Sequence, residues 1–223
     1  MSTRILVNGA NGRMGQMTVE TLAEYPEFSL VGKTTRQDNL TETIQETRAE
    51  IVIDFTHPDA VYQNTLTIIK AGAHPVIGTT GLQPSQIKEL QEHCKKLKWG
   101  GIIAPNFSLG MMLLLKYAQD LVKYFPDVEI IEMHHNRKKD SPSGTALYTA
   151  EMLAATNHKT IPIHAIRLPG LIAHEQIIFG SIGETITLKH DTTDRQCFMR
   201  GIYIACQKVT TLNQLIVGLE NIL

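Results

Sequence analysis

Short apolar runs alternate with amphipathic stretches along the first hundred residues. The runs have the length and β-branched content of buried strands, and they lie at residues 4–8, 29–34, 51–55, 75–79 and 101–104. Apolar residues at helical spacing fill the gaps, at residues 17–25, 59–71 and 84–97. This alternation predicts a mostly parallel sheet with helices on both faces, and such sheets bind ligands at the carboxyl ends of their strands.

The pattern changes after residue 106. Ser108 is suited to cap a long helix over residues 109–124, and a strand at 128–133 and a helix at 144–155 follow. Strand-like segments recur at 161–167, 175–179 and 184–190, and residues 195–209 are again helical. We therefore predict an α/β protein whose N-terminal domain, residues 1–106, is a Rossmann-like parallel sheet that binds a dinucleotide. The second domain, residues 107–194, is predicted to be α+β with an open mixed sheet, and residues 195–223 to pack back on the first domain.

The turn between the first strand and the first helix contains Gly9, Gly12 and Gly15 with the spacing G-x-x-G-x-x-G. Glycines here allow a tight turn and a close approach of the backbone to a pyrophosphate, which then binds at the helix N-terminus. Arg13 adds a positive charge for a phosphate. A glycine turn alone also occurs where nothing binds, but strand, turn and helix in this order favour nucleotide binding.

The turns after the other predicted strands are also small, polar or rich in glycine. Together with the first turn they would line one cofactor cleft. The residues that we expect to bind the cofactor are Gly9, Ala10, Asn11, Gly12, Arg13, Met14, Lys33, Arg36, Gly78, Thr79, Thr80, Ala104, Pro105, Asn106 and Phe107.

Composition and charge narrow the possible functions. With 43% hydrophobic residues the chain of 223 residues can bury a large core, and its formal net charge of -1 gives no support for a nucleic-acid partner. The longest wholly apolar run, residues 111–115, is far shorter than a membrane span, and the first residues lead into a strand without a signal-type segment. We therefore expect a cytoplasmic protein that does not bind a membrane. The three cysteines match no metal or redox spacing, and no metal site is expected.

Residues 132–146 have a composition suited to chemistry. The stretch follows a predicted strand and ends in Ser143, Gly144 and Thr145, a sequence typical of the first turn of a helix. The cationic residues beside that helix start are His134, His135, Arg137, Lys138 and Lys139, and the combination suits a small dicarboxylate. His134 and Lys138 can also transfer protons, because an imidazole titrates near neutral pH and a lysine held among other cations releases its proton more readily. Basic loops without a role occur on solvated surfaces, but the helix start favours a functional site.

Five motifs together resemble those of a known family. They are Gly9-x-x-Gly12-Arg13-Met14-Gly15, Asp54-Phe55-Thr56, Gly78-Thr79-Thr80-Gly81, Asn106-Phe107-Ser108 and Glu132-x-His134-His135-x-x-Lys138-x-Asp140-x-Pro142-Ser143-Gly144-Thr145-Ala146. This combination resembles the 4-hydroxy-tetrahydrodipicolinate reductases, also called dihydrodipicolinate reductases, and the resemblance runs through nearly the whole chain.

The resemblance implies an oxidoreductase of lysine and diaminopimelate biosynthesis. Such an enzyme reduces 4-hydroxy-tetrahydrodipicolinate, a cyclic dicarboxylate, to tetrahydrodipicolinate with NADH or NADPH. It further implies that His134 donates or accepts the proton, that Lys138 is the second catalytic residue, and that His135, Gly144 and Thr145 contact the substrate. We expect the amide of Ser143 to join these contacts, because it lies at the same helix start. The resemblance also points to a homotetramer joined through the sheets of the second domain.

The choice of cofactor depends on the residues after the second strand. An acidic residue there binds the ribose of NAD, whereas a basic residue accommodates the additional phosphate of NADP. Asp38 lies well beyond the predicted strand end, while Lys33 and Arg36 flank it. We therefore expect NADPH to be preferred modestly over NADH.

The chain departs from the family at three places. The segment between Thr34 and Ile51 is short, so a strand–helix unit of longer members is expected to be missing, and the segment before Arg167 is short as well. His174-Glu175 stands where the family tends to have Glu-His, so no contact is assigned there.

Two other functions remain possible from the sequence. One is a regulator that senses a dinucleotide without turning it over, and the other is a dehydrogenase of a different small amino or dicarboxylic acid. A regulator would explain the first hundred residues, but it would not explain why His134 and Lys138 lie beside a helix start.

Overall fold

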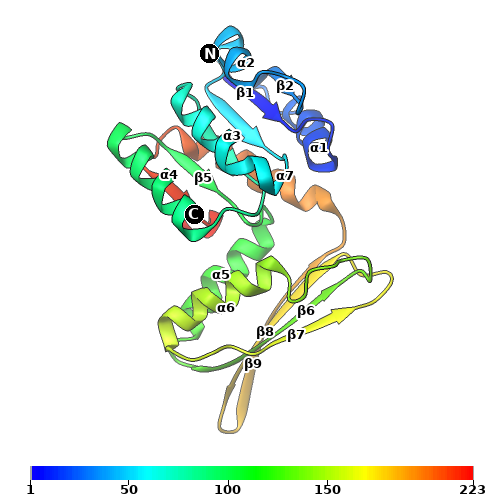
Figure 1. The fold of residues 1–223 in the computed structure, drawn as a ribbon. Helices are drawn as coiled ribbons and strands as arrows, with labels where there is room; N and C mark the ends of the chain where they lie inside the picture. Colours follow the sequence, from blue (N-terminus) through cyan, green and yellow to red (C-terminus); the bar gives the residue numbers. More distant parts are fainter. Residues whose placement is uncertain (1, 223) are drawn as a thin grey trace. The chain divides into compact units, whose positions relative to one another are not determined.

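The computed structural model describes residues 2–222, and the chain forms two compact units (Figure 1). Unit 1 consists of the segment up to Phe107 together with the segment from Phe198 onward, and unit 2 is the continuous stretch Ser108–Cys197. The division falls one residue beyond the predicted boundary at 106 and three residues beyond the one at 194. Unit 2 is therefore inserted between two parts of unit 1, and each unit has its own hydrophobic core.

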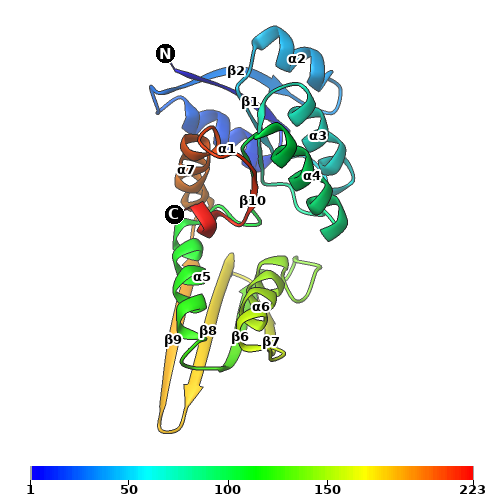
Figure 2. The ribbon, with the colours of Figure 1, turned by 90° about the vertical axis from the view of Figure 1, so that its left-hand side faces the viewer.

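Unit 1 is built on a six-stranded sheet of order β10-β5-β4-β3-β1-β2, in which every pairing is parallel. The strands are β1 (Thr3–Asn8), β2 (Phe28–Thr34), β3 (Ile51–Asp54), β4 (His74–Ile77), β5 (Gly101–Ile103) and β10 (Leu215–Val217). The helices are α1 (Arg13–Leu22), α2 (Leu40–Thr47), α3 (Pro58–Lys70), α4 (Pro84–Leu97) and α7 (Met199–Val209). Helices α2, α3 and α4 cover one face of the sheet, and α1 and α7 cover the other (Figure 2).

Coverage on both faces explains why the central strands are apolar throughout. Ile5 and Leu6 of β1 point to opposite faces and are both fully buried, as are Val52 and Ile53 of β3. The Rossmann-like sheet predicted from the alternating apolar runs is confirmed. Because all strands are parallel, their carboxyl ends meet at one edge of the sheet.

Two short elements of unit 1 were not predicted. Helix α2 lies in the segment where we expected a strand–helix unit to be missing, and residues 35–50, all described by the structure, contain this helix and no strand. Its N-cap is Asn39, whose side chain accepts a hydrogen bond from the amide of Glu42. Strand β10 has three residues, too few for a periodic pattern, and it pairs with β5 at the sheet edge.

Unit 2 contains a four-stranded sheet of order β7-β6-β8-β9 and two helices. These elements are α5 (Leu109–Leu121), β6 (Asp127–His134), α6 (Gly144–Asn157), β7 (Ile163–Arg167), β8 (Ala173–Ser181) and β9 (Glu184–Thr192), and a 3-10 turn, Arg195–Phe198, follows. Strand β6 pairs parallel with β7 and antiparallel with β8, so the predicted mixed sheet is confirmed.

Helices α5 and α6 pack on one face of this sheet around Ile130, Ile177 and Phe179 (Figure 2). No described helix of unit 2 covers the opposite face. In neither unit is a helix both long and apolar enough to cross a membrane, as far as residues 2–222 are concerned.

Candidate functional site

A cavity of about 640 Å³ opens at the carboxyl ends of the strands of unit 1. It is bounded by the glycine turn after β1, the turn after β2 and the segment from the end of β3 into α3. Four of the predicted cofactor-binding residues line it, namely Gly9, Asn11, Gly12 and Arg36. The cavity thus lies at the sheet edge where α/β proteins bind nucleotides.

The glycine turn fits a phosphate group. Gly9 has a φ of 84°, and a Cβ atom there would run into the carbonyl of Phe55. A Cβ atom on Gly15 would likewise meet the carbonyl oxygen of Gly9, so α1 lies very close to the turn. Gly12 is the N-cap of α1 and supplies no side-chain cap, which leaves N–H groups of the first helical turn available to an anion.

Asp54, the last residue of β3, is fully buried and joins several strand ends. Its carboxylate accepts hydrogen bonds from Asn8 Nδ2 at 2.8 Å, from Asn64 Nδ2 at 3.0 Å and from Thr79 Oγ1 at 2.5 Å. Thr34 Oγ1 in turn donates to Asn8 at 2.9 Å, which adds the end of β2. A buried carboxylate is stable only where hydrogen-bond donors surround it. This network therefore holds the ends of β1, β2 and β3 in fixed positions next to the cavity.

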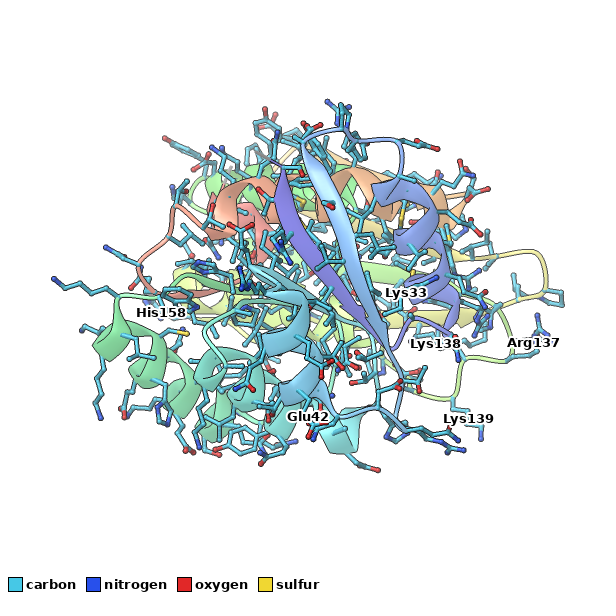
Figure 3. The ribbon with its side chains drawn as sticks, turned by 90° about the horizontal axis from the view of Figure 1, so that it is seen from above. Lys33, Glu42, Arg137, Lys138, Lys139 and His158 are labelled. Carbon is cyan, nitrogen blue, oxygen red and sulfur yellow. The ribbon has the colours of Figure 1, made fainter. Side chains whose placement is uncertain are left out.

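The other predicted cofactor residues do not line the cavity. Thr79 is buried against Asp54, and Phe107 packs against Phe55 with 5.7 Å between the ring centroids. Lys33 is exposed on β2 (Figure 3). The remaining residues outside the lining are Ala10, Arg13, Met14, Gly78, Thr80, Ala104, Pro105 and Asn106.

The turn after β2 contains Asp38, whose carboxylate forms hydrogen bonds within the turn. The carboxylate of Asp38 accepts hydrogen bonds from the amide of Thr35 at 2.7 Å and from its hydroxyl at 2.8 Å. These bonds lower the pKa of Asp38. Arg36, two residues earlier, is exposed and lines the cavity. His57 also lines the cavity, and its Nδ1 accepts a hydrogen bond from the amide of Asp59 at the start of α3.

The second site, in unit 2, is centred on the carboxylate of Glu132 on β6, which is fully buried. Arg167, at the end of β7, donates from Nη2 to Oε1 at 2.6 Å and from Nη1 to Oε2 at 2.8 Å. The amide of Ser143 donates to Oε1 at 3.0 Å, and Nδ1 of His134 lies 2.6 Å from Oε2. Burial alone would raise the pKa of Glu132, but these hydrogen bonds outweigh it and hold the pKa below its ordinary value.

Glu132 sets the orientation of the His134 ring. Because Nδ1 faces the carboxylate, Nε2 is the nitrogen left for a ligand. Burial lowers the pKa of His134, Glu132 offsets part of this effect, and the charges of Lys138 and Arg167 add to the lowering. His134 therefore has a fixed ring orientation and a pKa below the ordinary value of histidine, and these properties suit a group that transfers protons.

Lys138 lies in the loop after β6 and has an anionic partner. Its Nζ donates to Asp140 Oδ2 at 2.7 Å, and this hydrogen bond lowers the pKa of Asp140. We expected Lys138 to lie among other cations, and the structure adds an anionic partner, because the carboxylate of Asp140 lies next to its ammonium group. The side chain of Lys138 is 21% exposed, whereas Arg137 and Lys139 are exposed and point outward from the loop (Figure 3).

The N-terminus of α6 completes this site. Ser143 Oγ caps the helix by accepting from the amide of Ala146 at 3.2 Å, while its own amide is occupied by Glu132. Gly144 follows, and nothing lies within 4 Å of the place where its Cβ would be. An anion can therefore approach the amides of Gly144 and Thr145 rather than that of Ser143. Nδ1 of His135 is buried without a hydrogen-bond partner among the described residues, so a polar atom of this site is left unsatisfied.

These groups combine an imidazole of fixed orientation, an ammonium group and a helix start whose amides are open to an anion. The combination suits protonation of a small anionic substrate. Residues 2–222 contain no group of three or more His, Cys, Asp or Glu side chains arranged to hold a metal ion.

Sequence reasoning assigned no role to three residues that organise the two sites. Asp54 and Glu132 are visible in the sequence as acids near the ends of predicted strands, which is a signal of buried carboxylates that need donors. Arg167 carried no local signal, because its partner Glu132 lies 35 residues earlier in the chain.

Comparison with known proteins covers nearly the whole chain. Residues 3–107 match the family model described as dihydrodipicolinate reductase, N-terminus, and residues 110–223 match the one described as dihydrodipicolinate reductase, C-terminus. A 4-hydroxy-tetrahydrodipicolinate reductase of Legionella pneumophila strain Philadelphia 1 is 51% identical over 243 residues, with both chains covered completely. One of Coxiella burnetii strain Dugway is 49% identical over 239 residues, again with complete coverage of both.

A solved structure also matches the complete chain. It is a dipicolinate-bound dihydrodipicolinate reductase from Paenisporosarcina sp. TG-14, with 36% sequence identity and a TM-score of 0.89. Both chains are covered completely in this comparison.

We predict that Glu132→Gln lowers the pKa of His134 further, because the carboxylate is the group that favours the charged imidazole. The pKa is measured by NMR titration of the His134 ring protons. Glu129→Gln is the matched control, since Glu129 is an exposed acid of the same strand that pairs with His164 at 2.8 Å. An unchanged or raised pKa of His134 in Glu132→Gln would contradict the proposed role of this carboxylate.

Proposed function

Because the chain belongs to the dihydrodipicolinate reductase family, we propose that it reduces 4-hydroxy-tetrahydrodipicolinate to tetrahydrodipicolinate with NADPH or NADH. The reaction eliminates water from the hydroxylated ring and adds one hydride and one proton. The observation that carries the proposal for the site is the His134 ring, fixed by Glu132 next to Lys138 and the open start of α6. A dinucleotide sensor would need none of these groups.

The nucleotide fits the cavity of unit 1. The turn at Gly9 and Gly12 and the uncapped start of α1 would hold the phosphates, and the cavity wall at Arg36 and His57 would hold the ribose end. The bound nicotinamide supplies the hydride. The residues of the chain then have to bind the substrate, orient it and provide the proton.

His134 would provide that proton from Nε2. Its lowered pKa makes the imidazolium a stronger acid than an ordinary histidine, and Glu132 holds the ring in place during the transfer. Lys138 is the second catalytic residue, able to bind a carboxylate of the substrate or to assist the proton transfer. His135 and the amides of Gly144 and Thr145 would bind the substrate carboxylates.

The cellular role follows from this reaction. We propose that the protein acts in the cytoplasm, in lysine and diaminopimelate biosynthesis. The direct test is oxidation of NADPH or NADH, followed by absorbance, with freshly generated 4-hydroxy-tetrahydrodipicolinate. A regulator would bind the cofactor and never consume it, and a dehydrogenase of another acid would oxidise it only with that acid.

We expect His134→Gln and Lys138→Ala each to lower kcat by roughly a hundredfold or more, in line with the loss of acid–base assistance. The Kd of the cofactor should stay near the wild-type value, since both residues belong to unit 2. Lys139→Ala is the matched control and should have little effect, because Lys139 is exposed. Equal losses for both lysines would mean that the loop acts as a diffuse basic patch.

NADPH should be preferred over NADH by about 1–2 kcal/mol, or roughly fivefold to thirtyfold in kcat/KM. Arg36 lines the cavity and can pair with the additional phosphate, while the carboxylate of Asp38 is bonded to Thr35. Arg36→Ala should remove most of the preference, and high salt should reduce it by screening. Lys33→Ala, which changes an exposed residue outside the cavity lining, serves as the control. A preference for NADH at low salt would show that an acid binds the ribose.

A homotetramer is the assembly that we propose, joined through the sheet of unit 2. The face of this sheet opposite to α5 and α6 includes Ile131, Met133 and Ile178, all only partly buried, and such a face is suited to a second copy of the chain. We expect Ile178→Lys to dissociate the assembly, as measured by light scattering at micromolar concentration. Glu151→Lys, on the exposed side of α6, should leave it intact. A wild-type monomer would contradict the proposal.

A further inference from the structure

A row of paired residues crosses the helix-covered face of the sheet in unit 2. It consists of Ala165 on β7, Glu132 on β6, Glu175 on β8 and His190 on β9. Directly paired residues point to the same face, with Cβ atoms about 4.5–5.5 Å apart. Glu132 and Glu175 are therefore neighbouring carboxyl groups, and both are buried, with 0% and 4% of their surface exposed.

The two carboxyl groups have very different partners. Glu132 has four hydrogen bonds, two of them from the guanidinium of Arg167. Glu175 has one, from Thr149 Oγ1 at 2.7 Å, and within the described part of the chain no cation pairs with it. Ionising both of two adjacent buried carboxyl groups is unfavourable, because their negative charges repel each other. Glu132 ionises first, because it has more hydrogen-bond donors than Glu175. Burial and the charge of Glu132 raise the pKa of Glu175 to about 7, although the bond from Thr149 acts in the opposite direction.

The elements packed around Glu175 offer it no free positive charge. The polar groups that face it are Glu132 and His134 from β6, Arg167 from β7, Thr149 from α6 and His190 from β9. Arg167 is already bonded to both oxygens of Glu132. Nε2 of His190 lies 3.0 Å from the hydroxyl of Ser108 at the start of α5, and burial lowers its pKa. His174, the neighbour of Glu175 on its own strand, points to the opposite face and pairs with Asp191 at 2.8 Å.

We propose that Glu175 is a positioning residue of the proton donor, which acts on His134 through Glu132. When Glu175 loses its proton, a second buried negative charge appears beside Glu132, the residue that contacts the imidazole, and this charge keeps His134 protonated to higher pH. No hydrogen bond joins Glu175 to His134 among the described residues, so its charge reaches the ring across Glu132. The inference rests on the proposed function of His134, and it adds a residue at a position to which the sequence assigned no contact.

The test compares the wild type with Glu175→Gln, which keeps an acceptor for Thr149 but cannot ionise. We expect the NMR titration of His134 to move to lower pH in this variant. The kcat/KM of the variant should equal that of the wild type at pH 6 and fall at least about fivefold below it at pH 8. Glu184→Gln, a change at the exposed start of β9, should alter neither quantity.

A second variant covers the case that Glu175→Gln does not fold. Thr149→Val removes the hydrogen bond that lowers the pKa of Glu175, so ionisation of Glu175, and its effect on His134, should shift to higher pH. The pH dependence of thermal unfolding reports Glu175 independently of any activity. Since the folded state keeps a proton that the unfolded chain releases near its ordinary pKa, wild-type stability should fall as the pH rises toward 7, and Glu175→Gln should lack this fall.

The outcomes separate this inference from the proposed function. A wild type that reduces the substrate, with the same His134 titration in both proteins, would overturn the role of Glu175 and leave the reductase activity standing. Loss of the expected reductase activity with a shifted His134 titration would overturn the function and leave the coupling between the two residues intact.

Discussion

The buried carboxylate of Glu132 is the contact on which the site of unit 2 depends. It receives hydrogen bonds from three separate elements, namely the end of β7, the end of β6 and the first turn of α6. A carboxylate without these donors would be costly to bury, and removing one partner of a buried ion pair typically costs about 3–5 kcal/mol. The position of Arg167, the ring orientation of His134 and the start of α6 therefore depend on one another, because all three are bonded to the same carboxylate.

Unit 1 also has a buried carboxylate, Asp54, that joins several elements through hydrogen bonds. Asp54 gathers donors from β1, α3 and the turn after β4, much as Glu132 gathers them in unit 2. In both cases a buried acid lies at or near the end of a strand, and its need for donors fixes the arrangement of the surrounding turns. The cavity of unit 1 and the ring of His134 are thus held in place by groups that need not touch a ligand.

The sequence was sufficient for the fold where the evidence is local. Apolar runs identified the parallel sheet, Ser108 and Ser143 marked helix starts, and alternation along residues 128–133 identified β6. It was insufficient where a residue depends on a distant partner. Neither the bond of Arg167 to Glu132 nor the pairing of Glu175 with Glu132 leaves a trace in periodicity, since the residues are 35 and 43 positions apart. The roles of His134 and Lys138 stay predictions.

The insertion of unit 2 into unit 1 has a consequence for the order in which the chain can fold during synthesis. All residues of unit 2 leave the ribosome as one continuous stretch, so its core can close before the chain is complete. Unit 1 cannot do the same. Strand β5 has no outer neighbour until β10 has been made, and α7, which packs against β4 and β5, begins only at Met199. The outer side of β5 therefore stays unpaired in the nascent chain until β10 has been made, and during this interval the chain most needs protection from aggregation.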